Sequence, residues 1–138
     1  MKQPQLTIRV YSFSYKKGGI PKDETENGGG FVFDCRGILN PGRQEEYKAQ
    51  TGADAPVQQY LEEKTQMPQF LSLVHPLISI SIEDYLDRGF ENLQVAFGCT
   101  GGQHRSVYAA IKTAEFIKAK YPQTEVILQH NEQHHLNN

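Results

Sequence analysis

The sequence predicts a single α/β domain, a sandwich in which helices pack on a largely parallel sheet of about four or five strands. Short apolar runs typical of strands alternate along the chain with longer stretches of helical periodicity, which is the pattern of parallel strands joined by helical crossovers. A chain of 138 residues can bury one hydrophobic core but not a second of comparable size. We therefore assign residues 1–138 to one domain.

Four segments have the composition of strands. Residues 6–13 alternate apolar and polar side chains, as expected of a strand with one face in the core. Residues 31–35 form a short apolar run and are expected to be a buried second strand. Residues 93–97 and 125–129 are apolar runs of similar length, which predict a third and a last strand.

Three segments have the features of helices. Pro56 suits the first turn of a helix, where its missing N–H costs nothing. Apolar residues recur every three or four positions across residues 68–88, which predicts a long second helix with Pro76 as a site of kinking. The same periodicity runs from Arg105 until Pro122 forbids its continuation, which predicts a third helix.

The remaining segments are expected to be irregular. Residues 14–30 combine glycine clusters with charged side chains and predict a mobile loop. Residues 36–43 contain Asn-Pro-Gly and predict a turn. Residues 131–138 are polar and are expected to be a frayed tail.

Composition and charge exclude several classes of protein. No apolar run approaches the about twenty residues of a membrane span, and residues 1–5 lack the features of a signal peptide. We therefore expect a soluble, cytoplasmic protein in which Cys35 and Cys99 are reduced thiols rather than a disulfide. A formal charge of -2 gives no general attraction to nucleic acid, so any RNA contact requires a local basic patch.

The most informative segment is the loop at residues 98–106, which joins the third strand to the third helix. Its glycines at 98, 101 and 102 allow successive backbone N–H groups to turn inward, and the helix N-terminus adds partial positive charge. Arg105 can bind phosphate oxygens with two N–H groups, and Thr100 and Ser106 can donate hydroxyl protons. We expect this loop to bind a phosphomonoester or a similar anion.

Cys99 and Arg105 also have the Cys-x5-Arg spacing of the phosphate loop of cysteine-dependent phosphatases, with Ser106 after the arginine. This spacing supports an alternative hypothesis, in which Cys99 is the nucleophile of a phosphomonoester hydrolase. Gly98 stands where the tyrosine phosphatases carry histidine, and no aspartate is marked by the sequence as a general acid. Binding without turnover is therefore the favoured interpretation. The chain has no Walker A motif, so we expect neither ATP hydrolysis nor a cofactor.

A second group of candidate residues follows the strand at 31–35. Asp34 and Arg36 are expected at the same edge of the sheet as the anion loop, where they contact the ligand or form a structural ion pair. His104 either donates to the anion or faces solvent. No histidine cluster has the spacing of an established metal site, and we expect no metal. The full set of expected ligand contacts is Asp34, Arg36, Cys99, Thr100, Gly101, Gly102, Gln103, His104, Arg105 and Ser106.

Three ordered motifs carry a resemblance to a known family: residues 31–43 (FVFDCRGILNPGR), 51–57 (TGADAPV) and 95–108 (VAFGCTGGQHRSVY). From about Leu6 to His130, the chain resembles the C-terminal domain of the RapZ family of RNase adapter proteins, also called the YvcJ family of nucleotide-binding proteins. Members of that family carry an N-terminal kinase-like domain with a Walker A motif. That motif is absent here, so we expect a stand-alone domain.

The resemblance implies a sensor of an amino-sugar phosphate, glucosamine-6-phosphate, that takes part in binding a small regulatory RNA. It assigns the ligand to Cys99, Thr100, Gly101, Gly102, His104 and Arg105, and less directly to Asp34 and Arg36. Enterobacterial relatives have Lys-His-Gly-Ile-Pro where this chain reads KGGIP at residues 17–21, and they end in a basic tail where this chain ends in a polar one. An RNA or protein adapter that uses Lys16, Lys17 and the tail stays an alternative, as does a homo-oligomer.

Overall fold

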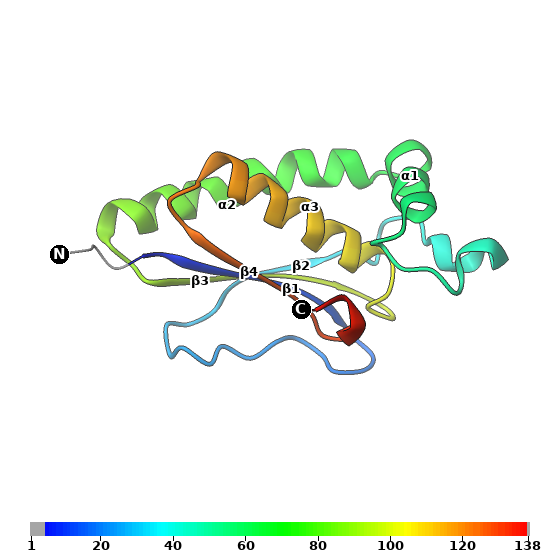
Figure 1. The fold of residues 1–138 in the computed structure, drawn as a ribbon, viewed down its shortest axis with the longest axis horizontal. Helices are drawn as coiled ribbons and strands as arrows, with labels where there is room; N and C mark the ends of the chain where they lie inside the picture. Colours follow the sequence, from blue (N-terminus) through cyan, green and yellow to red (C-terminus); the bar gives the residue numbers. More distant parts are fainter. Residues whose placement is uncertain (1–4, 138) are drawn as a thin grey trace.

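The computed structural model describes residues 5–137 and contains a four-stranded sheet with three α-helices on one face (Figure 1). The strands are β1 (Thr7–Ser14), β2 (Gly30–Asp34), β3 (Asn92–Cys99) and β4 (Glu125–His130). The helices are α1 (Ala55–Lys64), α2 (Met67–Arg88) and α3 (Arg105–Lys120), with short 3-10 helices η1 (Pro41–Arg43), η2 (Glu45–Tyr47) and η3 (His134–Leu136). All strand pairs are parallel. The predicted α/β class and parallel sheet are confirmed.

The strand order, β2-β3-β1-β4, explains where each connection lies. The crossovers from β2 to β3 and from β3 to β4 run the same way across the sheet, so the right-handed rule places all three helices on one face. The connection from β1 to β2 runs the opposite way, and the same rule sends it to the other face. Figure 1 shows this connection, residues 15–29, beneath the sheet. The segment predicted as a loop therefore covers the helix-free face.

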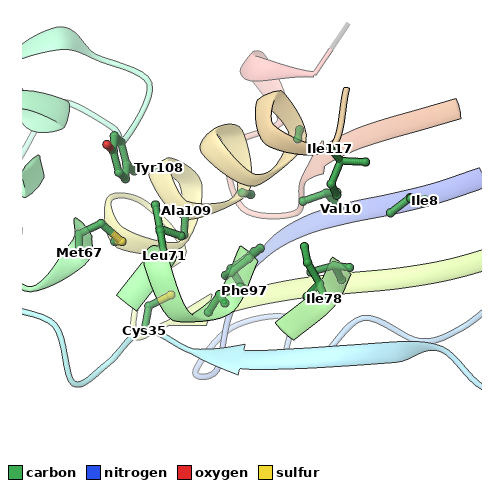
Figure 2. Close-up of a cluster of buried hydrophobic side chains, with 14 of the residues drawn as sticks. Ile8, Val10, Cys35, Met67, Leu71, Ile78, Phe97, Tyr108, Ala109 and Ile117 are labelled. Carbon is green, nitrogen blue, oxygen red and sulfur yellow. The ribbon is translucent and has the colours of Figure 1, made fainter. Parts of the chain in front are cut away.

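The hydrophobic core lies between the sheet and the helices (Figure 2). Ile8 and Val10 of β1 have no exposed surface, as the alternation along this strand predicts. They face α2 and α3, whose buried residues include Ile78 and Ile117. Each such side chain contributes about 1.5–3 kcal/mol by leaving water. This packing holds β1 and β3, and hence the loop after β3, in a fixed position.

The prediction that residues 31–35 form a buried strand is wrong in its burial. Phe31 and Phe33 of β2 are half-buried, and Val32 is 43% exposed. The reason is position, since β2 pairs only with β3 and is an edge of the sheet. An apolar run indicates a packed strand but does not distinguish a central strand from an edge strand. Cys35, which follows β2, is fully buried.

The other predicted elements differ from the structure mainly at their ends. Helix α2 continues through Pro76, and α1 begins one residue before Pro56. After β4, the stretch predicted as a frayed tail contains η3, and the Asn137 side chain exchanges two hydrogen bonds with the backbone of His130. Between residues 5 and 137, no helix combines the length and apolar character needed to cross a bilayer.

Candidate anion-binding site

The loop predicted at residues 98–106 lies where β3 ends and α3 begins, at the carboxyl edge of the sheet. Strand β3 extends to Cys99, and α3 begins at Arg105. Gly98 sits tightly against two aromatic rings, because a Cβ at this position would lie 2.4 Å from Cζ of Phe13 and 2.6 Å from Cε2 of Tyr15. A histidine, which tyrosine phosphatases carry at this point, does not fit here.

A cavity of about 280 Å³ opens beside this loop. One wall consists of predicted site residues: Cys99, Thr100, Gly101, Gln103, His104 and Arg105. The opposite wall comes from Asn40, Gly42 and Lys48, which lie around η1 and η2. Within the described chain, the lining has two cationic side chains and no carboxylate. The cavity is therefore suited to an anion.

Arg105 is buried and connects the anion loop to the 36–38 turn, which leads into the opposite wall. Its Nη1 donates to the carbonyl oxygens of Arg36, at 3.0 Å, and Ile38, at 2.8 Å. Its Nε is buried and has no partner in the described structure. The remaining N–H groups lie on Nε and Nη2, which together form the fork that binds phosphate or carboxylate with two parallel hydrogen bonds. Arg105 thus braces the 36–38 turn, and its Nε has no protein acceptor in the described structure.

The N-terminus of α3 adds backbone donors to the same region. His104 precedes this helix, and its side chain does not cap the first turn. The first N–H groups of a helix have no partner within the helix, and the helix dipole favours negative charge near them. His104 and Arg105, at the start of α3, line the cavity, so the cavity lies next to the helix end that anion sites use.

His104 and Gln103 hold the opposite wall in place. The Nε2 atom of His104 lies 2.8 Å from the carbonyl oxygen of Tyr47, and Nε2 of Gln103 donates to the carbonyl oxygens of Lys48 and Gln50 at 2.7 Å each. Burial lowers the pKa of His104, so the imidazole is neutral near pH 7. A neutral ring with Nε2 protonated toward a carbonyl has an acceptor at Nδ1. His104 therefore acts as a brace between the walls.

Gly52 allows the segment after η2 to pack directly on the start of α3. A Cβ at this position would lie 2.2 Å from the carbonyl oxygen of His104 and 2.5 Å from the backbone nitrogen of Tyr108. The backbone N–H of Gly52 also donates to the carbonyl oxygen of Gln103 at 2.9 Å. The sequence motif at residues 51–57 thus has a structural role, because it fixes the distance between the cavity walls.

Cys99 lies at the base of the cavity. Its thiol is 2% exposed and donates to Oγ of Ser106 at 3.1 Å. Ser106 itself is fully buried and does not line the cavity. Gly102 also lies outside the lining, where its positive φ of 67° forms the turn between β3 and α3. Of these loop residues, Cys99 and its neighbours Thr100 and Gly101 therefore line the cavity, whereas Gly102 and Ser106 shape the loop itself.

A comparison with protein families gives this site a context. The family model described as the RapZ C-terminal domain matches residues 6–134, which include every residue of the cavity lining. The chain belongs to this family. The match confirms the resemblance carried by the three sequence motifs.

Several similar proteins carry the name nucleotide-binding protein. The chain is 37% identical over 115 residues to a nucleotide-binding protein of Endomicrobium trichonymphae, covering 83% of this chain and 38% of the relative. It is 34% identical over 113 residues to one of Thermotoga neapolitana, covering 82% and 38%, and 39% identical over 106 residues to one of Cereibacter sphaeroides, covering 77% and 33%. This RapZ-family chain therefore spans between 33% and 38% of the length of these relatives.

The Asp34 and Arg36 side chains form an ion pair with each other and do not line the cavity. Nη2 of Arg36 lies 2.7 Å from Oδ2 of Asp34, with both side chains about half exposed, and this pairing lowers the pKa of Asp34. The guanidinium of Arg36 also stacks over the ring of Tyr15 at 3.9 Å. Neither residue lines the cavity. Their contribution in the described structure is to brace the turn whose carbonyl groups accept from Arg105.

The KGGIP segment at residues 17–21 follows β1 and is linked to the anion loop through Ser14. The hydroxyl of Ser14 donates to the carbonyl oxygen of Thr100 and accepts from the backbone N–H groups of Lys16 and Lys17. The backbone N–H of Gly18 donates to Oε2 of Glu132 at 3.0 Å. The two lysines do not line the cavity. Lys48, on the opposite wall, supplies the second cation of the lining, and its Nζ lies 3.1 Å from Oε2 of the exposed Glu45.

Sequence reasoning placed residues 34–43 at the same edge as the anion loop but did not name Asn40 and Gly42 as ligand contacts, and it missed Lys48 altogether. Asn40 and Gly42 had a signal, since Asn-Pro-Gly marks a tight turn, and the Asn40 side chain accepts from the Gly42 N–H at 2.9 Å. Lys48 had none, because it lies in a stretch of 3-10 turns without apolar periodicity. Its place depends on the contacts that Gln103 and His104 make with its neighbourhood.

Proposed function

We propose that this domain binds a phosphorylated small molecule, an amino-sugar phosphate such as glucosamine-6-phosphate, in the cavity between the anion loop and the η1–η2 segment. The observation that carries the proposal is the charge of the cavity. Lys48 and Arg105 border it, and within the described chain no carboxylate does. Arg105 also keeps an Nε–H group that has no protein acceptor in the described structure.

The size and polarity of the cavity favour a metabolite of sugar-phosphate size. Its volume of about 280 Å³ lies near the lower end of the range of about 300–1,000 Å³ for small-molecule sites. Asn40, Thr100 and Gln103 line the cavity together with the cationic residues, and their polar side chains are of the types that bind hydroxyl or amino groups. We expect the phosphate to lie at the N-terminus of α3 and the sugar to contact the side chains of Asn40, Thr100 and Gln103.

We propose binding without turnover, because the cavity lacks the parts of a cysteine-dependent phosphatase. The lining in the described chain includes no aspartate or glutamate that can protonate a leaving group. Nη1 of Arg105 is also committed to two backbone carbonyl groups. We expect no hydrolysis of an aryl phosphate by the parent protein. Turnover that is lost in Cys99→Ser would replace the binding proposal with an enzymatic one.

Calorimetric titration with glucosamine-6-phosphate, glucosamine and inorganic phosphate tests the proposal. We expect saturable binding that is tightest for the phosphorylated sugar and weaker in Lys48→Ala, because a cation beside the phosphate is lost. Lys118→Ala, on the exposed end of α3, is the matched control and is expected to bind like the parent. If none of the three compounds binds, the proposed ligand class is incorrect.

The names of the relatives suggest one further ligand for this titration. They are called nucleotide-binding proteins, and a nucleotide also presents phosphate to an anion site. A nucleoside monophosphate titrated under the same conditions separates the two ligand classes. Tighter binding of the nucleotide would keep the phosphate site but change the proposed metabolite.

A further inference from the structure

The two cysteines of the chain are neighbours at the ends of adjacent strands. In the β2–β3 register, Phe33 is opposite Phe97 and Asp34 is opposite Gly98. The next backbone hydrogen bond continues this ladder, with the N–H of Cys35 donating to the carbonyl oxygen of Gly98 at 2.7 Å. Cys35 and Cys99 are therefore opposite each other, although 64 positions separate them in the sequence.

Both cysteine side chains point to the helix-covered face. One register step earlier, the rings of Phe33 and Phe97 stack on this face with centroids 5.5 Å apart. Side chains two positions further along a strand lie on the same face, and both cysteines belong to the buried core cluster. Adjacent strands are about 4.8 Å apart, which is within the Cα separation of about 4.4–6.8 Å found in disulfides. Both thiols are free in this structure.

Access from solvent differs between the two thiols. Cys99 lines the 280 Å³ cavity, whereas Cys35 has no exposed surface and lies in the hydrophobic core (Figure 2). Burial, together with the neighbouring Cys99, raises the pKa of the Cys35 thiol well above its ordinary value. A small oxidant that enters the cavity therefore meets Cys99 first, and Cys35 is reachable only from Cys99.

We propose that Cys99 is a site of oxidation by hydrogen peroxide and that Cys35 resolves the oxidised product as an intramolecular disulfide. The Cys99 thiolate attacks one peroxide oxygen, the O–O bond breaks, and hydroxide leaves, so that Cys99 becomes a sulfenic acid. The Cys35 sulfur then attacks the Cys99 sulfur, the S–O bond breaks, and the oxygen leaves as water with the Cys35 proton. The two thiols lose two electrons in total, and peroxide is reduced to water.

The disulfide alters the same cavity. It removes the hydrogen bond from the Cys99 thiol to Ser106 and adds a covalent link between the segments that Arg105 already joins through Arg36 and Ile38. A ligand in the cavity blocks the path of peroxide to Cys99. This protection rests on the proposed function, whereas formation of the disulfide does not.

Intact-mass spectrometry of the full chain after exposure to hydrogen peroxide tests the proposal. We expect a loss of about 2 Da, a linked peptide pair containing Cys35 and Cys99, and full reversal by a dithiol. Cys35→Ala is expected to gain about 32 or 48 Da at Cys99 instead, since no resolving thiol remains. Circular dichroism of the variant confirms that it folds, and the linked peptide pair in the parent protein does not depend on the variant.

Three outcomes would overturn the proposal: irreversible oxidation of Cys99 in the parent protein, a disulfide between two chains, or no reaction at peroxide concentrations that oxidise the unfolded protein. In parallel, inorganic phosphate at ten times its dissociation constant is expected to slow disulfide formation about tenfold by occupying the cavity. Disulfide formation that phosphate does not slow would contradict the proposed anion site but would still support the disulfide between Cys35 and Cys99.

Discussion

Replacing Arg105 by alanine is expected to weaken both the fold and the anion site, and the two effects can be measured separately. The side chain is 5% exposed, and its Nη1 satisfies the buried carbonyl groups of Arg36 and Ile38. Two hydrogen bonds from a charged group, with partners that stay buried after the substitution, correspond to a loss of about 2–4 kcal/mol of unfolding free energy. For a chain of this size we expect the melting temperature to fall by roughly 5–15 °C.

The effect of Arg105→Ala on binding comes from the other edge of the guanidinium. Loss of the Nε and Nη2 donors is expected to cost about 1.5–3 kcal/mol of binding free energy, which is a dissociation constant raised roughly 10- to 150-fold. Denaturant unfolding gives the first quantity, and calorimetry with glucosamine-6-phosphate at a temperature where the variant is folded gives the second. Lys118→Ala is the control for both.

The two measurements refute different parts of the reasoning. Unchanged affinity in a folded Arg105→Ala protein would remove this residue from the anion site. Unchanged stability would mean that water satisfies the two carbonyl groups as well as Arg105 does. Arg105→Lys keeps the charge but loses the fork, so we expect it to recover only part of the affinity.

Three further predictions concern the scaffold around the site. Gly52→Ala is expected to destabilise the fold by about 1–3 kcal/mol or more and to weaken ligand binding, since its Cβ would overlap the carbonyl oxygen of His104; denaturant unfolding and calorimetry check both. Nδ1 of His130 lies 2.7 Å from Oγ of Ser12, and burial lowers the pKa of this imidazole to about 4. The free energy of unfolding is therefore expected to be highest above about pH 6.5 and to fall by on the order of 3 kcal/mol toward pH 4. His130→Gln is expected to reduce this pH dependence in unfolding curves measured between pH 7 and pH 4. Ile78→Ala removes a side chain without exposed surface and is expected to cost about 2–5 kcal/mol in the same assay, with m unchanged.

Each of these predictions has a result that contradicts it. A Gly52→Ala protein with parent stability would mean that the 51–54 turn moves away from α3 without cost. A slope that persists in His130→Gln would assign the acid sensitivity to His75 and His104, whose pKa values burial also lowers. A loss below about 1 kcal/mol in Ile78→Ala would mean that the core closes around the missing side chain.

The fold could be predicted from the sequence because local patterns determine most of it. Helix α3 and strand β3 carry strong periodicity, and both lie within two residues of their predicted bounds. The error on β2 has a different origin, since central and edge strands differ in their partners and not in their own residues. Strand order is set by crossovers over many residues, and no local pattern encodes it.

The candidate site also has a part that the sequence predicts and a part that it does not. The anion loop is contiguous in sequence, so its glycines, arginine and helix start could be recognised together. The wall that contains Lys48 could not, since hydrogen bonds from Gln103 and His104 across more than fifty positions place it there. The ion pair of Asp34 with Arg36 depends on the direction of the two side chains. The sequence does not determine this direction, so it allowed both a ligand contact and a structural pair.

The bridge that Arg105 makes between the anion loop and the 36–38 turn has a thermodynamic consequence. Its hydrogen bonds join residues 67 and 69 positions apart, so the cavity exists only when the whole sheet and its crossovers are formed. A ligand of this cavity binds the native state and not the unfolded chain, and at one hundred times its dissociation constant it adds about 2.7 kcal/mol to the free energy of unfolding. The abundance of the folded protein would thereby depend on the concentration of any ligand of this cavity.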